Sequence, residues 1–549
     1  MPKIILKNVT KRWGNFYGVE NLNLVIDDNS FVTILGPSGC GKTTTLRMIA
    51  GLDTPTSGLI MIGNDVVFDS NKGINIPANK RKVGFLFQNY ALWPNMTVYN
   101  NIAFGLSNIK EKMPIILFDA KIPLRLSEIL KNFKSIVDLV NDCKDKKGVI
   151  DKNKVCLKFI DSFEISMNTA KDLYSIYESI KDGNQNDADD KSKELIQKSN
   201  NIVKLHSEKG EEYNENFEMV KDGIVVQKLR KLTREEIDLK VRAVSRVVKV
   251  GMFMDRYPAE LSGGQQQRVA IARTLAPEPS VLFMDEPLSN LDAKLRLEMR
   301  YELQRLHVET GSTFVYVTHD QMEAMTLATK ICLINNGVLQ MYDSPLSVYN
   351  RPKNLFVADF VGNPSINFVD AKGVETAKGR IHLSMFDGDE ADFVFDNPIK
   401  LDSWFKDRED SIEKEKNERK ERLADKSYVE KGNKDERFKY HIQKVVEEDD
   451  VLEKDYKPVD GDFVVGIRPE FIQIRDQGHF EGIIYGAMPT GMESTIKIRM
   501  KDYLLTGVIF GSISYQIGTK IRFDVIGDKI SLFDRSSERL VGIGSLKIE

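Results

Sequence analysis

Residues Gly36–Thr43 have the types and the spacing that bind the phosphates of a nucleotide. They read Gly-Pro-Ser-Gly-Cys-Gly-Lys-Thr and fit the pattern G-x-x-x-x-G-K-[ST] at every fixed position. The glycines let backbone N–H groups wrap the phosphates, Lys42 offers a positive charge to the β- and γ-phosphates, and the Thr43 hydroxyl can bind Mg²⁺. The pattern therefore predicts that the chain binds a nucleoside triphosphate. The candidate nucleotide-binding residues of this segment are Gly36, Pro37, Ser38, Gly39, Cys40, Gly41, Lys42, Thr43 and Thr44.

A second group of chemically active residues closes the apolar segment Val281–Glu286. A buried strand rarely ends in two acids for packing alone. Asp285 stands where a carboxylate holds the Mg²⁺ shell, and Glu286 stands where a carboxylate polarises the attacking water. The pair predicts hydrolysis of the bound nucleotide, with a purely structural acidic pair as the alternative.

The stretch Leu261-Ser262-Gly263-Gly264-Gln265 narrows the class of enzyme. Its serine and glycines offer a hydroxyl and unobstructed N–H groups at an expected helix N-terminus, which attracts anions. Together with the phosphate-binding loop and the acidic strand, this stretch resembles the signature of ATP-binding-cassette (ABC) ATPases. In that family the signature of one subunit closes over the ATP held by another. The resemblance implies that Ser262, Gly263, Gly264 and Gln265 complete the nucleotide site of a second copy of the chain in a twofold dimer.

Four smaller features extend the resemblance to ABC ATPases. Gln88 matches the family glutamine that senses Mg²⁺ and links the site to the membrane partner, and His319 matches the switch histidine near the γ-phosphate. Ser289–Asp292 resembles the loop that communicates across the dimer. Trp13 stands where the family stacks an aromatic ring on adenine, with Tyr17 as a nearby alternative. The resemblance thus implies catalytic roles for Glu286, His319 and Gln88, and a metal site of Thr43, Gln88 and Asp285.

The tail and several local segments resemble one branch of the ABC importers. Gly466–Glu470 is similar to the regulatory C-terminal domain of maltose, glycerol phosphate and multiple-sugar importer ATPases. Gln88–Tyr99, Ser289–Arg296, Gly362–Phe368 and Leu532–Asp534 resemble the glycerol-3-phosphate and multiple-sugar type. The resemblance implies an ATPase subunit that energises import of a carbohydrate or glycerol-3-phosphate. A polyamine (spermidine/putrescine) importer and a regulatory protein that sequesters a cytosolic partner remain open, because no residue here contacts the transported solute.

The same resemblance implies the cofactors and the partners. The cofactors are ATP and Mg²⁺. The partners are a second copy of the chain, two integral-membrane permease subunits and, indirectly, a substrate-binding protein. The chain has a single set of motifs, and the expected place of action is the cytoplasmic face of the cell membrane, as a peripheral subunit.

The elements around these residues must bring them to one place. The apolar run Phe31–Leu35 predicts a strand that ends at Gly36, and Thr43–Leu52 predicts a helix. Strand, loop and helix stand in the order that phosphate binding needs, because the helix N-terminus attracts anions. The expected fold is an α/β P-loop NTPase of the ABC type with a helical subdomain, followed by a small all-β, barrel-like domain.

The pattern along the chain predicts a divided ATPase core. We expect the first part of the core at 1–107, a helical and low-complexity insertion at 108–229, and the second part of the core at 230–355. A β-rich regulatory domain follows at 356–549, with a charged insertion at about 402–457 that is typical of a solvated helix or a disordered loop.

The first insertion combines two kinds of sequence. Leu126–Val140 has apolar residues at the three- and four-residue steps of an amphipathic helix, whereas Lys181–Asp190 is polar and low in complexity. We expect a helical module near Gln88, either as a tolerated surface expansion or as a contact to the permease, a partner or the membrane surface.

The composition of the chain argues against several other classes of protein. The 549 residues carry a formal net charge of −3, which gives no reason to expect a nucleic-acid partner. The four cysteines show no C-x-x-C spacing, and no stretch has the roughly 18 consecutive apolar residues of a membrane span. An N-terminus without an apolar signal core completes the expectation of a soluble, intracellular protein.

Overall fold

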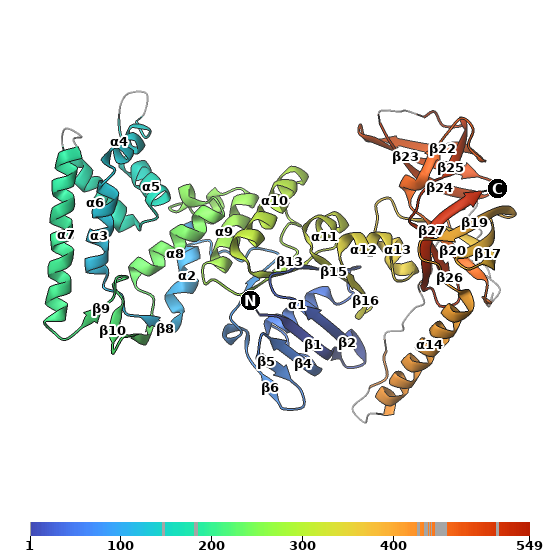
Figure 1. Ribbon diagram of the computed structural model, residues 1–549, viewed down its shortest axis with the longest axis horizontal. Helices are drawn as coiled ribbons and strands as arrows, with labels where there is room; N and C mark the ends of the chain where they lie inside the picture. The colour runs from blue at the N-terminus through green and yellow to red at the C-terminus, as the bar shows by residue number, and fades with distance from the viewer. Residues whose placement is uncertain are drawn as a thin grey trace. The chain divides into compact units, whose positions relative to one another are not determined.

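The computed structural model divides the chain into two compact units, Met1–Arg81 with Thr313–Glu549, and Lys82–Ser312. The described residues are 2–144, 149–180, 185–424, 429–432, 438, 440, 442–444, 458–511 and 515–548. Parts of both predicted insertions lie outside the described residues, namely 145–148, 181–184, 425–428, 433–437, 439, 441 and 445–457. The α/β fold with a C-terminal β-barrel agrees with the predicted fold class (Figure 1).

The first unit contains a parallel sheet whose central strand leads into the phosphate-binding loop. Strand β3 (Phe31–Leu35) pairs in parallel with β14 (Thr313–Val317) and β15 (Lys330–Asn335), and β16 (Val338–Asp343) runs antiparallel to β15. Every residue of β3 and β14 is buried, as expected for parallel strands covered on both faces. Helix α1 (Lys42–Ala50) begins directly after the loop, so the predicted strand, loop and helix are confirmed.

An antiparallel sheet in the same unit presents the hairpin that carries Trp13. Its strand order is β2-β1-β4-β5-β6, and the first two strands are joined by the turn at Gly14 and Asn15. The strands are β1 (Ile4–Trp13), β2 (Phe16–Ile26), β4 (Ser57–Ile62), β5 (Asp65–Asp69) and β6 (Ile74–Asn75). Trp13 is therefore the last residue of its strand, next to the turn of the hairpin.

The second unit holds the acidic strand. Strand β13 (Val281–Asp285) pairs in parallel with β7 (Val83–Leu86), so the residues that follow both strands emerge at the same edge. Helices α2 (Val98–Asn108), α8 (Arg234–Val247) and α9 (Gly263–Leu275) pack against one another beside this pair. Helix α10 (Ala293–Thr310) completes this part of the unit.

The insertion in the second unit is a helical bundle with a hydrophobic core of its own. Buried apolar residues from all five helices, among them Leu130, Phe133 and Phe159, form this core. The helices are α3 (Phe118–Leu130), α4 (Phe133–Asn141), α5 (Lys152–Phe163), α6 (Met167–Ser179) and α7 (Gln185–Ser207). The ribbon of β8 (Lys110–Pro114) and β12 (Gln227–Lys231) joins the bundle to α2 and α8, and β9 (Glu212–Tyr213), β10 (Met219–Lys221) and β11 (Ile224–Val225) form a small sheet.

The prediction of one amphipathic helix over Leu126–Val140 was wrong. The segment breaks after Leu130, and the side chain of Asn132 accepts a hydrogen bond from the Ser135 N–H and caps α4. Asparagine is a strong N-cap residue, so Asn132 favours the start of a new helix over the continuation of α3.

The tail consists of a closed barrel and a second sheet that share one core. Phe393, Phe463, Phe523 and Leu532 belong to this common core. The barrel strands are β17 (Asn367–Ala377), β18 (Arg380–Met385), β19 (Asp389–Phe395), β27 (Leu540–Ile548), β26 (Ile530–Asp534) and β20 (Asp462–Ile467). The second sheet contains β21 (Ile472–Ile474), β25 (Lys520–Val525), β22 (Phe480–Pro489), β23 (Glu493–Met500) and β24 (Tyr503–Phe510).

Arg468, in the segment that suggested a regulatory tail, ties the barrel to the helices before it. Its guanidinium donates to the carbonyls of Ala358, Val361 and Tyr349 at 3.1, 2.5 and 2.8 Å. These carbonyls lie in and after α12 (Pro345–Asn350) and α13 (Leu355–Phe360). Burial lowers the pKa of Arg468, and the carbonyls satisfy its donors.

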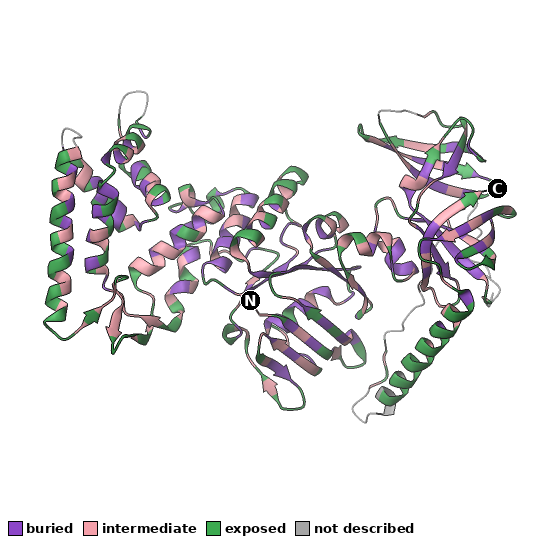
Figure 2. Cartoon of the chain, in the orientation of Figure 1, coloured by how far each residue is buried: buried purple, intermediate pink, exposed green. Residues whose placement is uncertain are grey.

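The charged insertion opens with the long helix α14 (Leu401–Ala424), which is anchored at its first turns. Arg408 is 8% exposed and donates to both carboxylate oxygens of Asp534 at 3.3 Å. Its guanidinium also lies 4.9 Å from the ring centre of Phe405. Beyond this anchor most described side chains of α14 are exposed, as predicted for a solvated helix (Figure 2).

We expect Arg408→Ala to lower the free energy of unfolding of the tail by about 3 kcal/mol, because it leaves the fully buried Asp534 carboxylate without its cation. Urea unfolding followed by tryptophan fluorescence measures the change, since Trp404 lies beside the pair. The control Arg522→Ala removes an exposed pair with Glu481 and should change stability by less than about 0.5 kcal/mol. Equal effects of the two variants would contradict the anchoring role.

Candidate functional site

The phosphate-binding loop is shaped by one close backbone approach. Gly41 is the N-cap of α1 with φ +100°, and a Cβ atom there would overlap the carbonyl oxygen of Gly18. Only glycine fits this position, so the loop N–H groups at the start of α1 stay uncovered by side chains. Lys42 is buried and donates to the carbonyls of Gly36 and Pro37 at 2.8 and 2.7 Å. Its ammonium group is therefore held over the loop that would bind the phosphates.

The β1–β2 hairpin distinguishes the two candidate stacking rings. Trp13 is 49% exposed, and a Cβ atom on Gly18 would be 2.5 Å from an atom at the edge of the Trp13 ring. Tyr17 is only 6% exposed, and its hydroxyl donates to the carbonyl of Val429 at 2.8 Å. The Trp13 ring is about half exposed, with the Lys11 ammonium 5.2 Å from its centre, and the Tyr17 ring is buried, so the difference in exposure favours Trp13.

The end of β13 gathers three of the predicted residues in the second unit. The amide of Gln88 donates to Glu286 Oε2 and to Ser289 Oγ, both at 3.4 Å. Asn290 donates to the Gln88 carbonyl at 3.1 Å, so the predicted communication loop also contacts this group. Asp285 is buried and precedes Glu286 directly. Carboxylate and amide oxygens of this kind bind Mg²⁺ and water, whereas softer metals prefer nitrogen or sulfur ligands.

Glu286 is held in a strained backbone conformation. Its φ is +44°, which is the left-handed region, and such a residue costs about 1–3 kcal/mol when it is not glycine. Ser289 stabilises the turn, because its hydroxyl donates to the Glu286 carbonyl at 2.9 Å. Strain of this kind concentrates at functional sites, and here it lies at the residue predicted to polarise the attacking water.

His319 lies in the first unit, in the turn between β14 and α11 (Gln321–Leu327). The buried carboxylate of Glu323 accepts hydrogen bonds from the hydroxyls of Tyr316 and Thr318, both at 2.7 Å. Asp320 caps α11 by accepting from the N–H groups of Met322 and Glu323. The residues on both sides of His319 are thus fixed. Sequence reasoning missed Glu323, although an N-cap aspartate three residues before a glutamate is a helix-start signal.

The signature begins a helix. Ser262 is the N-cap of α9, and its side chain and that of Gln265 form a reciprocal capping box. Gly263 is exposed, whereas a Cβ on Gly264 would be 2.6 Å from Leu295 of α10. The capping box takes up the N–H groups of Ser262 and Gln265, so the exposed Gly263 is the residue of the helix start that faces solvent.

Two further residues hold the segment after Gln88, and sequence reasoning missed both. Arg273 donates to the carbonyls of Ala91 and Tyr90 at 2.6 and 2.8 Å, and its guanidinium lies 4.9 Å from the ring centre of Trp93. Burial lowers the pKa of Arg273. The fully buried amide of Asn101 pairs with Trp93 through both its oxygen and its nitrogen. No local pattern indicates these contacts, because the partners are far apart in sequence or in an irregular loop.

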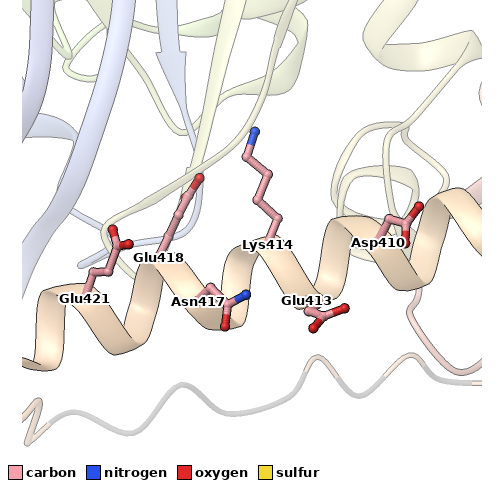
Figure 3. A pocket seen from close by; sticks show the side chains of 6 residues that line it. All are labelled: Asp410, Glu413, Lys414, Asn417, Glu418 and Glu421. Carbon is pink, nitrogen blue, oxygen red and sulfur yellow. The ribbon is translucent and has the colours of Figure 1, made fainter.

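A shallow depression on α14 is a different feature (Figure 3). Four carboxylates and one ammonium group line it, a charge that repels phosphates. The lining residues are Asp410, Glu413, Lys414, Asn417, Glu418 and Glu421. None of them belongs to the predicted nucleotide site.

The described residues contain neither a cluster of metal ligands nor a helix that could span a membrane. No three His, Cys, Asp or Glu side chains gather there into a metal site. Mg²⁺ commonly takes only one or two protein carboxylates together with phosphate and water, so a single carboxylate such as that of Asp285 is a ligand of the kind that it binds. None of the helices in the described ranges has the length and apolar character to span a bilayer.

Comparison with known proteins adds independent findings. A family model described as ABC transporter matches residues 19–159 and 165–289. The trehalose/maltose import ATP-binding protein MalK of Thermococcus litoralis is 36% identical over 386 residues, which cover 70% of this chain and 71% of that protein. The spermidine/putrescine import ATP-binding protein PotA of the Aster yellows witches'-broom phytoplasma is 36% identical over 364 residues, covering 66% and 74%. The maltose/maltodextrin import ATP-binding protein MalK of Escherichia coli is 33% identical over 385 residues, covering 70% of each.

We expect Glu323→Ala to slow ATP hydrolysis about tenfold while ATP affinity changes less than threefold. The change leaves the hydroxyls of Tyr316 and Thr318 without their acceptor and loosens the turn that carries His319. Phosphate release at saturating MgATP measures the rate, and nucleotide titration measures the affinity. The control Glu298→Ala alters an exposed residue of α10 and should leave both unchanged. A Glu323→Ala protein with wild-type turnover would rule out the positioning role.

Proposed function

Because this chain belongs to the ABC transporter ATP-binding family, we propose that it is the ATP-hydrolysing subunit of an importer for a carbohydrate or a glycerol phosphate. The observation that carries the proposal is the likeness, along 70% of the chain, to subunits named for the import of trehalose, maltose and maltodextrin. The β-rich tail beyond the ATPase core is consistent with that branch.

In the proposed site, residues of one copy bind and activate one nucleotide. Trp13 stacks on the adenine, the loop Gly36–Thr43 surrounds the phosphates, and Lys42 neutralises charge on the β- and γ-phosphates. Mg²⁺, when bound, offsets the charge that develops on the transferred phosphoryl group, and Thr43, Gln88 and Asp285 would hold it.

Glu286 is the proposed base of the reaction. Its carboxylate orients and polarises the attacking water, while His319 contacts the γ-phosphate. The hydrogen bond from Gln88 and the strained backbone at Glu286 support this role, because both restrict where the carboxylate can point. Preorganisation of this kind removes reorganisation cost from the chemical step.

A second copy of the chain supplies the remainder of each site. We infer that Ser262, Gly263, Gly264 and Gln265 at the start of α9 contact the γ-phosphate of the ATP held by the partner. The exposed Gly263 and the hydroxyl of Ser262 support this role, since their N–H and O–H groups are available to an external anion. Two ATP molecules would then join two copies about a twofold axis, and hydrolysis would loosen them.

The remaining partners follow from the importer function. The dimer would dock on two integral-membrane permease subunits at the cytoplasmic face of the membrane, and a substrate-binding protein would act through them. Gln88 and the segment held by Arg273 and Asn101 lie on one loop, which supports a link between the nucleotide and a permease contact.

We expect Glu286→Gln to slow ATP hydrolysis by at least about a hundredfold, because the amide cannot accept the proton of the attacking water. ATP binding should stay within about threefold, and the dimer should accumulate in the presence of ATP. Phosphate release and size-exclusion chromatography provide the two measurements. Glu298→Gln, an exposed carboxylate of α10, is the matched control and should leave turnover unchanged. Unchanged turnover in Glu286→Gln would remove Glu286 from the mechanism.

The identity of the solute needs a measurement of transport. A specific observation keeps polyamines as the second candidate, because two of the similar proteins are named for spermidine and putrescine import. In the complete complex reconstituted with its permease and binding protein, we expect ATP hydrolysis and uptake to rise with a sugar or a glycerol phosphate. Stimulation by spermidine or putrescine alone would replace the carbohydrate assignment and leave the ATPase assignment intact.

A further inference from the structure

Four residues of the charged insertion lie against the hairpin that carries Trp13. These residues, 429–432, are named here the 429–432 strap. The hydroxyl of Tyr17 donates to the carbonyl of Val429 at 2.8 Å, and the N–H of Gly432 donates to the carbonyl of Asn15 at 2.8 Å. The contacts join segments more than 400 residues apart in sequence, within the first unit.

A charged pair adds to these two hydrogen bonds. The ammonium of Lys431 lies 2.8 Å from Glu20 Oε2 on β2, and the two side chains are only 10% and 25% exposed. An exposed ion pair contributes little because water and salt screen it. A charge-assisted hydrogen bond that is largely shielded from solvent is shorter and stronger, so this pair can fix the position of β2.

The part of β2 between these contacts forms the back wall of the phosphate-binding loop. The carbonyl of Gly18 leaves no room for a side chain on Gly41, and a Cβ on Gly337 would be 2.9 Å from the same oxygen. Glu20 N–H donates to the carbonyl of Gly337 at 2.9 Å, and Gly337 N–H donates to the carbonyl of Cys40 at 3.1 Å. Glu20 is thus connected to the loop through a single residue. A shift of Glu20 or Tyr17 would move the backbone that shapes the loop.

The described residues that follow the strap contact the tail and the helices before it. The ring of Phe438 lies 5.5 Å from that of Phe356 on α13. Tyr440 lies edge-on to Phe368 of the barrel and donates to Asp370 at 3.2 Å. The insertion is therefore held on one side by the barrel and on the other by the nucleotide-binding hairpin.

We propose that Lys431 and the 429–432 strap are positioning elements of the nucleotide site. They hold β2 where Gly18 shapes the loop at Gly41 and where Trp13 faces the base, and they thereby raise the affinity for ATP. This inference rests on the proposed function, in which Trp13 stacks on adenine. The inserted segment is then part of the ATP site of this chain, although it belongs to the tail by sequence.

The test compares Lys431→Ala with a matched control in the full-length protein. The control, Lys414→Ala, removes an exposed ammonium from α14 of the same insertion (Figure 3). We expect Lys431→Ala to raise the KM for ATP and the Kd for a fluorescent ATP analogue about five- to tenfold, with kcat within twofold. Lys431→Arg, which keeps the charge, should recover most of the affinity, and Lys414→Ala should change neither constant.

A second variant perturbs the strap without removing a charge. A Cβ atom on Gly432 would overlap the side-chain amide of Asn15, so Gly432→Val should displace either that side chain or the strap, and we expect it to raise KM by less than Lys431→Ala does. If Lys431→Ala and Gly432→Val lower the melting temperature but leave KM and Kd unchanged, the strap is only structural and the inference is overturned.

Trp13→Ala separates this inference from the function on which it rests. If Trp13→Ala weakens nucleotide binding more than tenfold while Lys431→Ala has no effect, the strap inference fails and the adenine assignment stands. If neither variant affects binding, both fail. If both single variants weaken nucleotide binding, and the double variant weakens it by less than the product of the two single fold-changes, the strap acts through the hairpin as proposed.

Discussion

The close approach of the Gly18 carbonyl to Gly41 is the constraint on which the nucleotide site depends. A phosphate-binding loop works through bare backbone N–H groups, and these stay bare only if no side chain enters the turn. The backbone of β2 makes such a side chain impossible, because a Cβ on Gly41 would overlap the Gly18 oxygen. The loop therefore needs β2 in one place, and β2 in turn is fixed by Gly337 and by contacts from the charged insertion.

Residues that act through local patterns could be predicted from the sequence. The run Phe31–Leu35, the loop after it and the start of α1 follow from periodicity and glycine spacing, and β3 and α1 lie where expected. The tail strands around Phe463–Ile467 and Ile521–Val525 follow from β-branched and aromatic residues between turns, and they lie in the barrel and the second sheet. The roles of the site residues remain proposals that the geometry supports.

Contacts between distant segments could not be predicted. Arg273 donates to carbonyls 182 and 183 residues away, and Val429 contacts Tyr17 across 412 residues. A single sequence does not indicate which distant residues form such pairs, because neither partner belongs to a recognisable local pattern. The local prediction of one helix over Leu126–Val140 was wrong because Asn132 caps a new helix there, although the apolar periodicity continues.

The two insertions differ in how they contact the ATPase core, and this difference predicts which one affects nucleotide binding. The helical bundle closes on itself: β8 and β12 pair in continuous register from Lys110–Lys231 to Pro114–Gln227, so its ends meet, and its apolar side chains fill its own core. Such a module adds little closure cost and little strain to the fold that carries it. The charged insertion leaves the barrel along α14. Of its described return residues, 429–432 lie on the β1–β2 hairpin, and Phe438 and Tyr440 lie on α13 and the barrel. The bundle reaches the core at α8, where Met167 N–H donates to Asp238 and Arg246 donates to the carbonyl of Ile160, whereas the strap contacts the strand that shapes the phosphate-binding loop. We therefore expect changes in the charged insertion to alter ATP binding more than changes in the bundle do.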